Sequence, residues 1–71
     1  MIQPGVVLQV GPDAGPHFVE AFAFRVVALV DWPAYDGWTW VEGDQLDSAG
    51  RVVERNRIFV LLSGLREVER R

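Results

Sequence analysis

The stretch FVEAFAFRVVALVDWPAYDGWTWVEGDQL, residues 18–46, decides the fold class. Its side chains alternate with a period of two, and β-branched and aromatic residues dominate it, which favours strands over a helix. The first half predicts a long strand from Phe18 to Trp32, and the second half predicts a strand from Trp38 to about Leu46. The residues between them, PAYDG, have the composition of a turn. The stretch therefore predicts two long antiparallel strands.

The alternation also predicts which side chains share a face. Trp38 and Trp40 point to one side of their strand, and Val41 points to the other. Gly43 in the middle of this strand predicts a bulge or a sharp bend. One face of the long strand carries Phe22, Phe24, Val26, Ala28, Val30 and Trp32. We expect a core that contains Phe24, Val26, Val30, Val41, Ile58 and Val60.

Shorter segments on both sides complete the set of strands. Val6–Val10 reads as a first strand, and residues 11–16, GPDAGP, end it as a loop because proline cannot donate to a strand ladder. Residues 47–50, DSAG, predict a tight turn with its glycine in the left-handed region. A fourth strand follows from Val52 to about Leu62, and Leu65–Arg71 predicts a last short strand or one helical turn.

Strands without a long helix, joined by tight turns, predict an all-β fold. We expect one domain over residues 1–71: a small SH3-like, partly open antiparallel barrel of four to five strands with a short C-terminal tail or turn. The chain also resembles short, uncharacterised SH3-like β-barrel proteins from GC-rich bacteria. The resemblance rests on Pro4-Gly5, Phe24-Arg25-Val26-Val27, the tryptophan-rich strand, Leu46-Asp47-x-x-Gly50, and Ile58-Phe59-Val60 followed by Gly64-Leu65. It implies a fold and no activity.

Composition excludes several classes of function. The 71 residues include no cysteine and a single histidine, His17, so neither a disulfide nor a Cys- or His-based metal site can form, and we read His17 as a loop residue. No apolar run is long enough to span a bilayer, and the N-terminus has no signal-peptide pattern. We expect a soluble, cytoplasmic protein without metal, cofactor or membrane partner.

Charge is unevenly distributed along the chain. Residues 1–47 hold seven acidic residues and one arginine, whereas residues 48–71 hold three acidic residues and six arginines. This asymmetry suits an anionic partner or head-to-tail pairing of two copies. The plainer interpretation is that the two halves neutralise each other across the sheet.

The main candidate site is the aromatic segment 31–40, DWPAYDGWTW, which holds four of the eight aromatic rings of the chain. Trp32 and Trp38 could face each other across the turn. Rings beside carboxylates suit a cation, and flat aromatic grooves suit proline-rich peptides. The alternative is that the rings only stabilise the hairpin or the core. The candidate groove comprises Asp31, Trp32, Tyr35, Asp36, Trp38 and Trp40.

The sequence contains two further groups of charged residues that could form a site, one acidic and one basic. Glu42, Asp44 and Asp47 follow the tryptophans with no calcium-loop spacing, and we expect them to be solvated surface acids. A nucleic-acid surface is the second group, although the acidic whole-domain charge argues against it. Its candidate residues are Arg51, Arg55, Arg57 and Arg66. No motif supplies a catalytic constellation, so we expect no enzymatic activity and assign no catalytic residue.

The segment 58–62, IFVLL, is apolar on both faces. A small barrel covers one face of such a strand, and the other needs a closed barrel or a second chain. The leading interpretation is therefore a non-enzymatic small β-barrel that associates with another protein or with a second copy of itself. The alternatives are an adaptor that binds a peptide or a cation at the aromatic segment, and a nucleic-acid-associated barrel.

Overall fold

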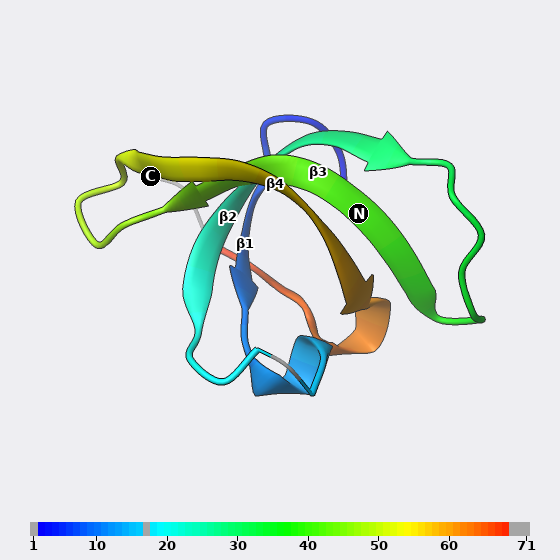
Figure 1. The fold of residues 1–71 in the computed structure, drawn as a ribbon. Helices are drawn as coiled ribbons and strands as arrows, with labels where there is room; N and C mark the ends of the chain where they lie inside the picture. Colours follow the sequence, from blue (N-terminus) through cyan, green and yellow to red (C-terminus); the bar gives the residue numbers. More distant parts are fainter. Residues whose placement is uncertain (1, 17, 69–71) are drawn as a thin grey trace.

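A computed structural model describes residues 2–16 and 18–68 (Figure 1). The chain forms five antiparallel strands in one open sheet, which confirms the all-β prediction. The strands are β1 (Val7–Val10), β2 (Phe22–Val30), β3 (Trp38–Leu46), β4 (Val52–Leu61) and β5 (Arg66–Glu67). A 3₁₀ turn lies between β1 and β2, η1 (Pro12–Ala14), and another between β4 and β5, η2 (Leu62–Gly64). Within the described ranges, no helix is long and apolar enough to cross a membrane.

The strands are ordered β4-β3-β2-β1-β5, so β4 and β5 form the two edges of the sheet. The long strands β2, β3 and β4 make an antiparallel meander. β1 pairs with β2 on one side and with the two-residue β5 on the other. Figure 1 shows that the sheet is strongly curved, with β3 and β4 arching across the molecule.

A β-bulge in β2 changes which of its side chains face the core. Val26 pairs with Gly43, but Ala28 pairs with Glu42, so Val27 is an extra residue in the ladder. Residues that pair directly lie on the same face of the sheet. The predicted single face of β2 is therefore wrong beyond Val26: Ala28 and Val30 lie on the outer, convex side, and Val30 is only partly buried there. The sequence predicted a bulge or a sharp bend at Gly43 in β3, whereas the extra residue lies in β2, opposite Gly43 and Glu42.

Position 43 must be glycine because there is no room for a side chain beside the Phe24 ring and the Arg25 carbonyl. It is buried, and a β-carbon there would lie 2.6 Å from Cε2 of Phe24 and would collide with the carbonyl oxygen of Arg25. The Phe24 ring thus lies directly over the glycine backbone and is fully buried. Because one strand has no side chain where the other has a bulge, the two strands can bend around this ring.

The core lies on the concave side of the sheet. Four of the six predicted core residues are buried, and Ile58 packs against them as a partly buried neighbour. The core cluster consists of Leu8, Val10, Ala14, Phe18, Phe24, Val26, Val41 and Val60. The two 3₁₀ turns meet at one end of it, where a β-carbon on Gly64 would collide with the carbonyl of Asp13.

Element boundaries differ from the predictions mainly at loops. β2 begins at Phe22, four residues later than predicted, because Phe18 leaves the ladder and packs its ring against Gly15. Residues 62–64 form η2 and do not extend β4. The predicted left-handed glycine of the DSAG turn is confirmed, since Gly50 has a φ of 80°. His17 and residues 69–71 lie outside the described residues.

Candidate functional site

An aromatic cluster covers the outer face of β3 and β4. Trp40 pairs directly with Phe59 across the two strands, and their ring centroids are 4.9 Å apart. Trp38 stacks on the same phenyl ring at 4.9 Å with an interplanar angle of 16°. The outward side of the IFVLL segment is therefore covered by tryptophans of the same chain. A second chain is not needed to cover Phe59.

The connection between β2 and β3 adds two more rings. Trp32 meets Trp40 edge to face at 5.1 Å, and Tyr35 approaches Phe59 at 6.3 Å. Trp32 thus contacts Trp40 and not Trp38 across the turn, because the connecting segment is longer than a tight hairpin turn. We call the five rings the aromatic surface: Trp32, Tyr35, Trp38, Trp40 and Phe59.

Two hydrogen bonds hold the connecting segment in place beside this surface. The Trp40 indole Nε1–H donates to the carbonyl of Pro33 at 3.3 Å, and the Trp38 backbone N–H donates to the carbonyl of Tyr35 at 2.9 Å. Tyr35 is nevertheless 77% exposed and Trp32 is 46% exposed. These two rings are therefore accessible to a partner, whereas the hairpin-packing alternative does not require their exposure.

The aromatic surface contains two adjoining hollows that share Trp40. One has a volume of about 370 Å³ and is lined by Pro33, Ala34, Tyr35, Trp40 and Phe59. The other, of about 460 Å³, is lined by Trp32, Trp40, Glu42, Arg55, Asn56 and Arg57. Asp31 and Asp36 line neither, so the carboxylates expected beside the rings are not in the hollows. The first hollow is uncharged, and the second is charged.

Ion pairs between β3 and β4 continue the surface away from the rings. Arg55 donates to both carboxylate oxygens of Asp44, at 2.8 and 3.0 Å, and Arg25 lies 3.8 Å from the same carboxylate on its other side. The hydrogen bond from Arg55 holds the pKa of Asp44 below its ordinary value, while desolvation by burial opposes this shift. Asp44 is only 6% exposed, so the expectation that it is a solvated acid is wrong.

Arg57 is held differently. Its Nε is 3.6 Å from Oε1 of Glu42, too long for a hydrogen bond, and its guanidinium carbon lies 5.2 Å from the ring centroid of Trp32. The side chain is 53% exposed. Among the described residues its guanidinium donates no hydrogen bond, so its N–H groups remain available in the lining of the charged hollow.

The arginines do not form a continuous basic surface. Arg51 pairs with Asp47 at 3.3 Å, and Arg55 and Arg57 pair with acids of β3. Arg66 lies on β5, at the opposite edge of the sheet. Three acids of β3 and the turn that follows it, Glu42, Asp44 and Asp47, therefore neutralise arginines of β4 and that turn. This pairing counts against the nucleic-acid alternative.

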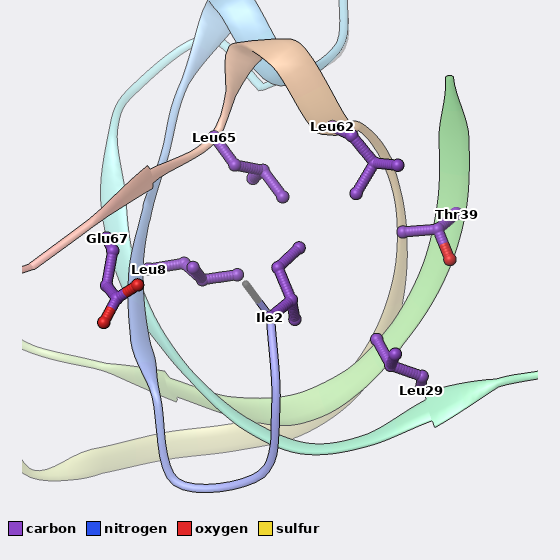
Figure 2. A pocket seen from close by; sticks show the side chains of 7 residues that line it. All are labelled: Ile2, Leu8, Leu29, Thr39, Leu62, Leu65 and Glu67. Atoms are coloured by element: carbon purple, nitrogen blue, oxygen red, sulfur yellow. The ribbon is translucent and has the colours of Figure 1, made fainter. Parts of the chain in front are cut away.

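A separate hollow of about 480 Å³ opens on the concave side, between η2, β2 and the N-terminal segment (Figure 2). Its lining is aliphatic apart from Thr39 and Glu67, which lie on opposite sides of the opening in Figure 2. Ligand sites combine an apolar lining with a few converging polar groups. The two polar residues of this hollow do not converge, and the aromatic surface is the better candidate. In the described part of the chain, no group of acidic or histidine side chains could hold a metal ion.

The aromatic surface was only partly predictable. The sequence identified four of its five rings but did not include Phe59, which was treated only as part of the segment 58–62 that is apolar on both faces. The alternation of β4 does place Phe59 on the same face as Arg55 and Arg57. The strand register that brings Phe59 opposite Trp40 could not be read from the sequence. No family model, curated protein or solved structure matches the chain, so its function must be inferred from the geometry of the surface.

Proposed function

We propose that the protein is a non-enzymatic binding module that takes an extended segment of another protein on the aromatic surface. The observation that carries this proposal is the exposure of Tyr35 and Trp32 above two adjoining hollows. Tryptophan and tyrosine are enriched among the few residues that supply most of the binding energy at protein interfaces. The uncharged hollow has aromatic walls, which suit the rings of a proline-containing segment.

A free cation is a poorer occupant than a peptide. The face of Trp32 is already approached by Arg57, which the chain itself supplies. The acidic residues that were expected to attract a cation lie outside the hollows, and Glu42 is paired with Arg57. The surface therefore has ring faces but no unpaired carboxylate in its lining. This distribution favours the peptide interpretation.

A second copy of the chain is also a poorer partner than a different protein. The β4 edges of two copies related by a two-fold axis would pair as antiparallel strands. In such a pair, directly opposite residues lie on the same face of the combined sheet. If the two-fold axis passes any residue from 54 to 57, two side chains of like charge lie directly opposite each other, and such pairs are destabilising. An axis at residue 56, for example, places Arg55 of one copy opposite Arg57 of the other. Further along β4, the Gly15 loop approaches the backbone oxygen of Phe59. The arginines thus protect the free edge against self-pairing.

The proposal is tested by selecting binders from a displayed library of ten random residues, with the whole protein as bait. The same selection uses Tyr35→Ala and, as a matched control, Val19→Ala, which truncates a residue that is 81% exposed and lies outside the aromatic surface. We expect enrichment with the wild type and the control. A selected peptide should bind Tyr35→Ala at least about tenfold more weakly. No enrichment, or enrichment unaffected by Tyr35→Ala, contradicts the proposal.

A further inference from the structure

We infer that the bound segment carries an acidic residue next to its apolar or proline residues, and that Arg57 binds its carboxylate. This inference rests on the proposed function and specifies its ligand. It starts from the difference between the two arginines that line the charged hollow. Arg55 already makes two hydrogen bonds to Asp44, whereas the guanidinium of Arg57 makes none among the described residues.

Two contacts restrain Arg57 although its guanidinium donates no hydrogen bond among the described residues. Trp32 lies beside its guanidinium at 5.2 Å, and the carboxylate of Glu42 lies 3.6 Å from its Nε. A guanidinium held in this way has lost part of its conformational freedom before a ligand arrives, so less entropy is lost when it binds a carboxylate. Its planar fork of N–H groups matches a carboxylate in two-point contact.

The surroundings also favour an anion over a cation. The ion-paired residues of β2, β3 and β4 are Arg25, Arg55 and Arg57 with Asp44 and Glu42, which leaves one positive charge in excess among them. Arg57 lines the charged hollow, and this hollow adjoins the uncharged one because Trp40 lines both. A segment with its apolar residues against Tyr35 and Phe59 would therefore bring a neighbouring side chain to Arg57.

The test repeats the library selection on Arg57→Gln and on Arg51→Gln. Arg51 provides a matched control because it is also an arginine at an exposed site near β4 and lines neither hollow. We expect Asp or Glu to be enriched beside the apolar motif with the wild type and with Arg51→Gln, and to return to its library frequency with Arg57→Gln. A ¹H–¹⁵N correlation spectrum of each variant checks that the fold is retained.

A synthetic copy of the most enriched wild-type peptide then gives the magnitude. Replacing its acidic residue with the amide should weaken binding to the wild type about fivefold, which is about 1 kcal/mol, and should leave binding to Arg57→Gln unchanged. Enriched peptides without an acidic residue, or an acid preference that persists in Arg57→Gln, overturn the inference and leave the proposed function standing. A library without any enrichment overturns the proposed function, and the inference with it.

Discussion

The replacement Gly43→Ala should destabilise the protein for a steric reason alone. Gly43 is not among the described residues with a positive φ, so alanine can adopt its backbone conformation. The added β-carbon would meet Cε2 of Phe24 at 2.6 Å and the carbonyl oxygen of Arg25. The ring belongs to a fully buried side chain, and the carbonyl belongs to the paired strand. Neither can move without shifting the bend between β2 and β3.

Overpacking of this kind costs roughly 1–3 kcal/mol, and we expect the upper end, about 3 kcal/mol, because one obstacle is backbone. A domain of this size has a total stability of only about 3–5 kcal/mol. The melting temperature should fall by roughly 12–24 °C, at about 4–8 °C per kcal/mol for a domain of this size. Thermal unfolding followed by far-UV circular dichroism measures the change, and urea unfolding followed by tryptophan fluorescence gives the free energy.

Gly50→Ala provides the matched control. Gly50 has a φ of 80° and no heavy atom within 4 Å of its virtual β-carbon, so only conformational strain opposes the substitution. That strain costs about 1–2 kcal/mol. Gly43→Ala should therefore be the more destabilising of the two. A Gly43→Ala protein within about 0.5 kcal/mol of the wild type would refute the account of how Phe24 is accommodated.

Three further predictions concern the charge pair, the core and the oligomeric state. The hydrogen bond from Arg55 lowers the folded-state pKa of Asp44 below its ordinary value of 3.8. The stability from this pair is therefore fully present well above pH 3.8 and is lost as the pH falls through the lowered pKa. Below about pH 4 the urea midpoint should fall more steeply in the wild type than in Asp44→Asn, and equal slopes would contradict this. Phe24→Ala should cost about 3–5 kcal/mol, whereas Val30→Ala, on the outer face, should cost at most about 1 kcal/mol in the same urea assay; comparable losses would show that the bulge does not redirect β2. Sedimentation equilibrium at micromolar concentration should show one 8.0 kDa species, because the tryptophans cover Phe59 and the β4 arginines oppose edge pairing; a dimer that dissociates on dilution would restore self-association.

Local pattern predicted the number and order of the long strands, although not every strand boundary. The alternation of residues 38–46 predicted the bounds of β3 and the faces of Trp38, Trp40 and Val41, because a strand with one buried face must alternate. The glycine and proline pairs predicted the loop at residues 11–16, since proline cannot join a ladder. The ring-rich segment was identified as the candidate site because aromatic residues concentrated in a connection are visible in composition.

Pairing between strands was decided only by the tertiary structure. The extra residue at Val27 moves Val30 to the outer face, and a period of two cannot reveal where one strand gains a residue relative to its neighbour. Phe59 joins the aromatic surface because the β3–β4 register places it opposite Trp40. The same register pairs Asp44 with Arg55, and the Asp44 carboxylate, which the sequence predicted to be solvated, is buried. Alternation assigns a side chain to a face, but its neighbours on that face come from other strands, and only the folded sheet brings them together.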